Sequence, residues 1–232
     1  MQKCLELWTE IDNNLPFKGT NPEAANMQRN WSCWTGGQHI FGAKGMDCWG
    51  VVDYVSELVR PKTILEIGFN AGHSSCMWLA RTDAKVTSVD IAYGICHKSG
   101  SDILKRKFPD RFEFIHCDST KVYPLIKDNT YDLVIVDGGH GTDVCISDCE
   151  LALKLGAKYL LVDDVIVAKN VGDAVDTFVE QNKTRVKMIN KWNVAWGVVL
   201  YEVLPEVPPE VVPEVLSEVV PEVLSEVTEQ AQ

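Results

Sequence analysis

The sequence predicts one doubly wound α/β domain, in which a seven-stranded, mostly parallel sheet carries helices on both faces. The first observation is that five short, apolar segments rich in β-branched residues alternate with segments of helical length, which is typical of parallel strands buried on both sides. The second is that two further strand segments near the end of the domain are only three residues apart. So short a connection permits an antiparallel hairpin but no parallel crossover. The predicted parallel strands are 63–68, 86–90, 112–116, 132–137 and 159–163, and the hairpin strands are 185–192 and 196–203.

The helices are expected between these strands, at 74–82, 99–108 and 142–155. We expect the α/β domain to span residues 61–203. Residues 1–60 would form an N-terminal helical and lid segment, and residues 204–232 a separate tail.

Composition and charge exclude some classes of protein. The 232 residues are 46% apolar and 24% charged, an ordinary balance for a globular protein. A formal net charge of −11 argues against a general nucleic-acid binder, which needs a basic surface. No apolar run is long enough for a signal peptide or a membrane helix, and the eight cysteines form no C-x-x-C pair. We expect a cytoplasmic protein with reduced thiols and no membrane partner.

The tail repeats the octapeptide VVPEVLSE and carries seven glutamates with no lysine or arginine. Its prolines interrupt any helix. One interpretation is an extended, solvated and disordered tail. The other is a docking strip for a basic or apolar partner, which the sequence does not identify.

In a doubly wound sheet, ligands bind beyond the carboxyl ends of the strands. Four of the five parallel strands end in or just before an aspartate. A single aspartate there is often a helix cap or a turn residue. Aspartates at the ends of four strands along one edge indicate a binding face rich in carboxylates. These residues are Asp90, Asp118, Asp137, and the pair Asp163 and Asp164.

The stretch ILEIGFNAGHSS, residues 64–75, ends a strand at one glycine and starts a helix after another. Gly68 and Gly72 would let the backbone turn sharply and approach a ligand, and the following helix would point its N–H groups at it. The alternative is a tight turn without a ligand. The dinucleotide pattern G-x-G-x-x-G fails because Asn70 and His73 replace two of its glycines, and no G-K-[ST] follows.

The pattern Glu66-x-Gly68-x-x-x-Gly72, with Asp90 ending the next strand, resembles motif I and the second-strand acid of class I S-adenosylmethionine (SAM)-dependent methyltransferases, which have a Rossmann-like fold. The resemblance implies that Glu66 orients the glycine loop, that Asp90 accepts from both ribose hydroxyls, and that Asp118 receives the adenine amino group. The residues it implies for SAM binding are Glu66, Gly68, Phe69, Asn70, Gly72, Asp90, Cys117, Asp118 and Asp137.

Residues 136–165 are similar to the small-molecule O-methyltransferases of the catechol, caffeoyl-CoA and macrocin-like types. The resemblance implies a magnesium ion held by Asp137, Asp163 and Asp164. Carboxylate oxygens suit this ion, and three carboxylates without a cation would repel one another and raise their pKa values. The alternative is that Asp163 and Asp164 cap a turn.

His140 is the candidate general base, because an imidazole can take up a proton near neutral pH. It could instead cap the next helix or orient Asp137. We expect Cys145 and Cys149 to pack in the buried face of their helix, Asp148 to be structural, and Trp49 to pack against the first helix. Trp31 and Trp34 could either pack or line a substrate pocket.

The sequence therefore predicts a magnesium-assisted methyltransferase that acts, with Asp137 and His140 as catalytic residues, on a hydroxyl of a small molecule, either a sugar or a phenol. The alternatives are a nucleotide-dependent oxidoreductase and a catalytically silent scaffold that presents the tail. A sulfur or nitrogen acceptor and a homodimer also stay open.

Overall fold

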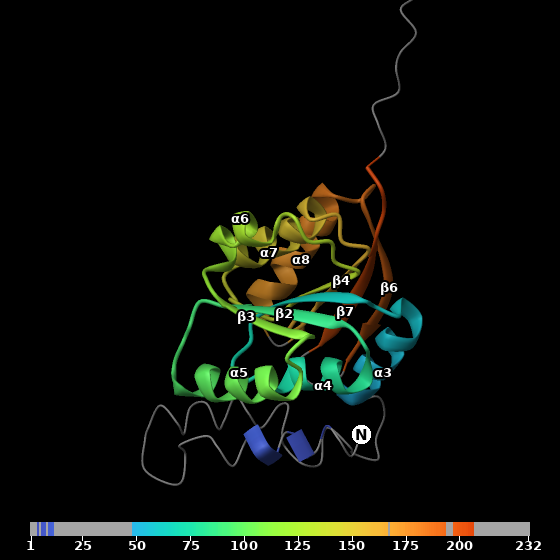
Figure 1. Cartoon of the computed structure of the whole chain (residues 1–232). Helices are drawn as coiled ribbons and strands as arrows, with labels where there is room; N and C mark the ends of the chain where they lie inside the picture. Colours follow the sequence, from blue (N-terminus) through green and yellow to red (C-terminus); the bar gives the residue numbers. More distant parts are fainter. Residues whose placement is uncertain are drawn as a thin grey trace, which may run out of the picture.

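The structure, a computed structural model, describes residues 4, 6–7, 9–11, 48–166, 168–193 and 197–206. Most of the predicted lid, including Trp31 and Trp34, and the tail from residue 207 onward lie outside these residues. The described chain forms a seven-stranded sheet with the strand order β3-β2-β1-β4-β5-β7-β6 (Figure 1).

The five predicted parallel strands are present and parallel to their neighbours. They are β1 (Thr63–Ile67), β2 (Lys85–Asp90), β3 (Phe112–His116), β4 (Leu133–Val136) and β5 (Tyr159–Val162). The predicted hairpin is also confirmed, since β6 (Val186–Trp192) and β7 (Val198–Val203) pair antiparallel and β7 pairs antiparallel with β5. The sheet is therefore doubly wound and mixed, as predicted.

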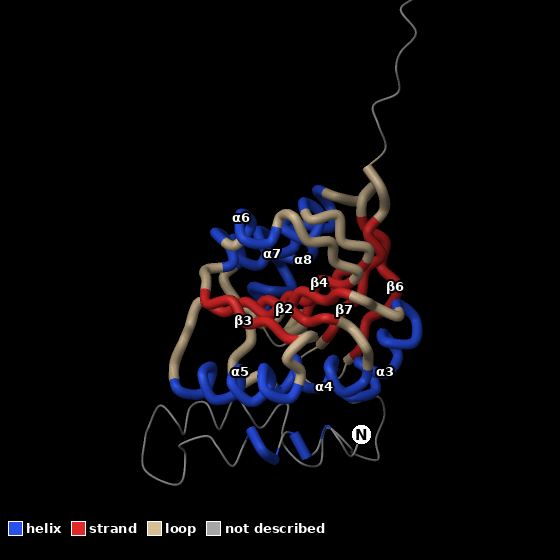
Figure 2. Tube along the Cα trace, viewed as in Figure 1, coloured by secondary structure: helices blue, strands red, loops and turns tan. Residues whose placement is uncertain are grey.

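Helices cover both faces of the sheet (Figure 2). On one face lie α3 (Cys48–Val59), α4 (His73–Arg81) and α5 (Ile95–Lys107). On the other lie α6 (Tyr123–Ile126), α7 (Thr142–Lys154) and α8 (Lys169–Gln181), with the short 3₁₀ helix η1 (Ser119–Lys121) leading into α6.

Each layer of helices has its own apolar core against the sheet. Trp78 and Leu104 anchor the core under α4 and α5, and Trp49 packs against it, as predicted. Cys149 and Phe178 anchor the core under α7 and α8. Because β1 and β4 have buried residues at every position after Thr63, both faces of the central strands are sealed. This fixes the strand ends as the only parts of the central strands that reach the surface.

The described residues bear on the state of the cysteines and on a possible membrane helix. The six cysteines described are free thiols, and Cys145 and Cys149 are buried as predicted. None of the described helices is both long and apolar enough to cross a membrane.

Candidate functional site

The candidate site lies where the strand order reverses, between β1 and β4. From β1 the chain proceeds outward to β2 and β3, and then returns to β4 on the other side of β1. The loops that leave the carboxyl ends of β1 and β4 therefore diverge, which is the position where doubly wound sheets bind ligands. The predicted candidates follow the carboxyl ends of β1 to β5 along this edge.

The glycine loop after β1 has left-handed backbone at three positions, with φ of 98° at Gly68, 50° at Asn70 and 87° at Gly72. A Cβ on Gly68 would lie 1.9 Å from the carbonyl oxygen of Asp137, and one on Gly72 would lie 2.5 Å from the ring of Phe69. Atoms of the protein, the carbonyl of Asp137 and the ring of Phe69, thus lie too close to these two positions for a side chain. Gly68 is needed to bring the end of β1 against the end of β4.

Glu66 is buried beside this loop, and it bonds to side chains of neighbouring elements. Its Oε2 accepts from the hydroxyls of Ser75 on α4 and Ser88 on β2, the latter at 2.7 Å. Its Oε1 has no hydrogen-bond partner within the described part of the chain. Burial raises the pKa of Glu66, against the lowering effect of the nearby serines. Glu66 therefore ties β1 to β2 and to the start of α4.

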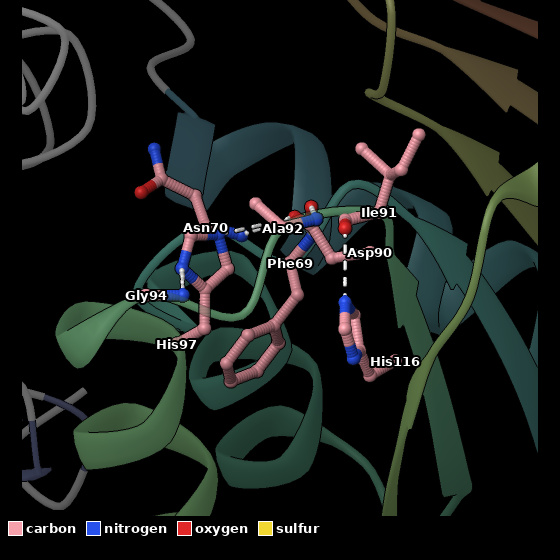
Figure 3. A network of polar contacts seen from close by, with 8 residues as sticks. All are labelled: Phe69, Asn70, Asp90, Ile91, Ala92, Gly94, His97 and His116. Atoms are coloured by element: carbon pink, nitrogen blue, oxygen red, sulfur yellow. Dashed lines mark hydrogen bonds and ion pairs between the residues drawn. The ribbon is translucent and has the colours of Figure 1, made fainter.

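Asp90, at the end of β2, is bonded to the glycine loop (Figure 3). Its Oδ2 accepts from the backbone N–H groups of Phe69 and Asn70, both at 2.9 Å, and its Oδ1 accepts from Ala92 N–H at 2.8 Å. Burial raises the pKa of Asp90, but His97 and the backbone amides lower it more, to about 2. Asp90 is therefore an ionised acceptor held rigidly at the edge of the sheet.

Asp118 uses its carboxylate locally. It caps η1 by accepting from the N–H of Thr120 at 3.0 Å and from its hydroxyl at 2.7 Å, and it pairs with Lys121 at 3.2 Å. The bonds to Thr120 and Lys121 lower its pKa. Cys117 is partly buried, with its thiol 3.4 Å from the carbonyl oxygen of Asp118. Asp118 thus serves as the helix cap that an aspartate after a strand often provides.

Three carboxylates follow β4 and β5, and their charges oppose one another. Burial, followed by the charges of Asp163 and Asp164, raises the pKa of Asp137 well above its usual range. Burial and Asp164 raise the pKa of Asp163 to about 7. Burial also raises the pKa of Asp164, although His140 opposes this effect. Neighbouring carboxylates therefore contribute to the raised pKa values of Asp137 and Asp163, whereas burial alone raises that of Asp164.

His140 lies 2.7 Å from this group, with its Nε2 against Oδ2 of Asp164. The histidine is half exposed, whereas the Asp164 side chain is buried. Asp164 has a left-handed backbone, with φ of 65°, and its N–H donates to Oδ1 of Asp163 at 2.8 Å. The loop after β4 and the turn after β5 are thus joined by the contact between Nε2 of His140 and the carboxylate of Asp164.

The chemistry of these three carboxylates fits a divalent cation, but their geometry does not. Among the described residues, no lysine or arginine is a main cause of the pKa shift of Asp137 or Asp163, so a hard metal ion would relieve the repulsion. However, no group of three or more histidine, cysteine, aspartate or glutamate side chains in the described ranges is arranged to hold a metal ion.

Three residues that the sequence did not mark for this site now belong to it. Ile91 follows Asp90 and is 69% exposed, so it offers apolar surface beside an ionised carboxylate. His97 is buried with its Nε2 3.6 Å from Oδ2 of Asp90. Asp148, expected to be structural, is buried under Gly138 without a full hydrogen bond from any described residue, and burial raises its pKa to about 6 against a smaller lowering by Ser119. The spacing Gly94-x-x-His97, from helix N-cap to third residue, could have indicated His97.

Comparison with known proteins confirms the class of domain. Residues 65–165 match a family model described as a methyltransferase domain. No curated protein sequence matches this chain.

Solved structures share the fold at low sequence identity. A putative caffeoyl-CoA O-methyltransferase from Staphylococcus aureus is 16% identical, with a TM-score of 0.59 over 86% of this chain and 99% of the other. An O-methyltransferase from Bacillus cereus in complex with S-adenosylhomocysteine (SAH) is 18% identical, with a TM-score of 0.57 over 88% of this chain and 91% of the other. A SAH-bound methyltransferase from Podospora anserina is 17% identical, with a TM-score of 0.56 over 81% and 98%. These structures confirm the predicted Rossmann-like fold.

Proposed function

We propose that this chain, which carries a methyltransferase domain over residues 65–165, transfers the methyl group of SAM to a hydroxyl of a small molecule, a sugar or a phenol. The observation that carries the proposal is the state of Asp90. It is an ionised carboxylate fixed by the amides of the glycine loop, at the switch point of the sheet and beside exposed Ile91. A rigid acceptor next to an apolar surface suits a nucleoside, whose ribose donates hydrogen bonds and whose base is flat and apolar on its faces.

The residues of this edge fit SAM. Asp90 would accept from the ribose, and Ile91 would contact the adenine face. The first turn of α4 has no side-chain cap, so its N–H groups favour the negatively charged end of the ligand. When bound, SAM supplies an electrophilic methyl group on a sulfonium. The glycine loop and Asp90 position that group, and alignment alone can supply much of the rate enhancement.

We assign His140 as the base that receives the proton of the acceptor hydroxyl. Because its Nε2 bonds to Asp164, the Nε2 carries the hydrogen and Nδ1 is left as the basic nitrogen. As the acceptor oxygen bonds to the methyl carbon, the bond between that carbon and the sulfur of SAM would break with its electron pair going to sulfur, and SAH would leave. The O–H electron pair would stay on the acceptor oxygen, and the proton would pass to Nδ1 of His140. Asp164 then stabilises the imidazolium that forms.

We further propose magnesium assistance, with Asp137, Asp163 and Asp164 as the ligands. The support is the mutual repulsion of these carboxylates, which a cation would relieve. Bound magnesium would lower the pKa of the acceptor hydroxyl. Asp163 also stabilises the turn after β5, because its Oδ1 accepts from the N–H of Asp164.

The first experiment is calorimetric titration of SAM and SAH into the purified chain, with and without magnesium, with NAD as the control ligand. We expect both adenosyl ligands to bind and NAD not to bind. NAD binding would favour an oxidoreductase, and the absence of all binding would favour a scaffold. Light scattering on the same sample tests the homodimer that the sequence leaves open.

The second experiment assigns the roles at the carboxylate edge. SAH release is measured with panels of phenols and sugars, because the release of SAH reports transfer to any acceptor. His140→Gln should lower kcat by about a hundredfold or more, as general bases contribute roughly 10²–10⁴, with little change in SAH affinity. Asp163→Asn should abolish the magnesium response, whereas Asp173→Asn on exposed α8 is a matched control with the same change of charge. A magnesium response that survives Asp163→Asn would contradict the metal assignment.

A further inference from the structure

His97 is a buried histidine that joins two parts of the proposed SAM site (Figure 3). It is the third residue of α5, and its side chain turns back toward the start of the helix. Its Nδ1 accepts from the backbone N–H of Gly94 at 3.2 Å. Since Nδ1 is an acceptor in this bond, the ring hydrogen of the neutral imidazole lies on Nε2. That nitrogen faces Oδ2 of Asp90 at 3.6 Å.

The carboxylate of Asp90 has few acceptor positions left for a ligand. An ionised carboxylate offers about four lone-pair sites, and three backbone amides already bond to it. A ribose can therefore bond only to the acceptor positions that the amides leave open, and the carboxylate must be oriented so that these positions face the ribose. Besides those amides, His97 is the group that stabilises the charge of Asp90, and no lysine or arginine among the described residues contributes.

The same loop is held from its other side by a second histidine. Nε2 of His116, at the end of β3, lies 3.0 Å from the carbonyl oxygen of Ile91, and Tyr93 stacks on the His116 ring. His116 is the neighbour of Asp90 across the β2–β3 pair, but its ring bonds to the carbonyl of Ile91 and not to the Asp90 carboxylate that SAM would use. It therefore supports the loop that carries Ile91, whereas His97 supports both the loop, through Gly94, and the carboxylate.

We propose that His97 is a positioning residue that fixes Asp90 for recognition of the ribose hydroxyls of the adenosyl ligand. This inference rests on the proposed function. Its Nε2–H keeps Oδ2 of Asp90 directed at the glycine loop, which leaves the other face of the carboxylate for the ribose. His97 acts only through Asp90, so its effect should depend on whether the ligand has ribose hydroxyls.

The two nitrogens of His97 can be tested separately. His97→Asn retains an acceptor near Gly94 N–H but cannot reach Asp90. His97→Gln retains a donor near Asp90 but loses the acceptor at Gly94. The probes are SAH and its 2′,3′-dideoxy analogue, titrated by calorimetry into the full chain, with thermal unfolding recorded for each variant.

We expect His97→Asn to weaken SAH binding about tenfold, because Asp90 loses the electrostatic contact that orients it, and to leave binding of the dideoxy analogue unchanged. His97→Gln should bind SAH within about threefold of the unchanged protein, because one neutral donor replaces another at the same atom. His116→Ala is the control and should weaken both ligands to the same degree, since it acts on the loop alone.

Equal weakening of both ligands by His97→Asn would show a purely structural role and overturn the inference, as would unchanged binding of both. If His97→Asn does not fold, a folded His97→Gln that no longer distinguishes SAH from its analogue overturns it equally. Failure of the unchanged protein to bind SAH at all would instead refute the proposed function, and this inference with it.

Discussion

Gly68→Ala should be far more damaging than an ordinary glycine replacement, because two separate costs meet at this position. The first is the backbone, since φ is 98° and left-handed conformations cost a residue with a Cβ about 1–2 kcal/mol. The second is the contact of the new Cβ with Asp137 O at 1.9 Å. That oxygen belongs to the backbone directly after β4 and cannot move aside as a flexible side chain would. Overpacking typically costs about 1–3 kcal/mol. The sum is about 2–5 kcal/mol.

Gly156→Ala separates the two costs. Gly156 also has a left-handed φ, 64°, but nothing lies within 4 Å of its Cβ position. This variant should lose only about 1–2 kcal/mol. Urea unfolding of both variants measures the two free energies of unfolding, and SAH titration reports the site. We expect Gly68→Ala to be the less stable by at least 1 kcal/mol and to bind SAH at least tenfold more weakly. Equal losses of stability would refute the contact between β1 and β4 as the reason for this glycine.

Three further changes test individual carboxylates. Asp148→Asn should be more stable than the unchanged protein at pH 8, and its stability should depend less on pH. Burial raises the pKa of Asp148 to about 6, so the native state binds the proton more tightly than the unfolded state. The free energy of unfolding of the unchanged protein should therefore fall by roughly 3 kcal/mol as the pH rises from about 4 through 6. Urea unfolding at pH 5 and pH 8 measures this, and an unchanged difference between the two pH values would contradict it. Asp90→Asn should weaken SAH binding by tenfold or more in calorimetry, because an amide cannot accept from three backbone N–H groups and a ribose at once; unaltered affinity would remove Asp90 from the site. Asp132→Ala should cost about 1–3 kcal/mol in urea unfolding, because the N–H groups of Lys62 and Thr63 lose their acceptor, yet leave SAH affinity unchanged.

The sheet was predictable because its signal is local. The parallel strands other than β3 are buried over most of their length, and the short gap before Trp196 allows only a hairpin. The edge that carries Asp90, Asp137 and Asp163 follows from the parallel direction of the strands. These inferences need only the period of the side chains and the direction of the chain.

The roles of individual side chains were less predictable, because they depend on which loops meet. The pairing of His140 with Asp164 requires the loop after β4 to reach the turn after β5, and the left-handed backbone of Asp164 directs its side chain there. Gly68 was expected to approach a ligand, but its partner is the carbonyl of Asp137. The local use of Asp118 depends on Thr120 and Lys121, which follow it in the chain, so the capping alternative could be anticipated.

Asp137 and Asp163 differ in environment from an aspartate that stabilises the fold, and this contrast supports the location of the proposed site. Asp132, at the edge where the strands begin, accepts from two backbone amides and pairs with Lys158 at 2.7 Å, and its pKa is lowered. At the edge where the strands end, burial and neighbouring carboxylates raise the pKa values of Asp137 and Asp163, and no lysine or arginine of the described residues is a main cause that opposes the shift. Carboxylates that only stabilised the fold would be expected to resemble Asp132. Strongly perturbed buried acids cluster at sites where a ligand, a metal ion or a proton transfer uses them, and this supports the proposal that the carboxyl edge is the functional one.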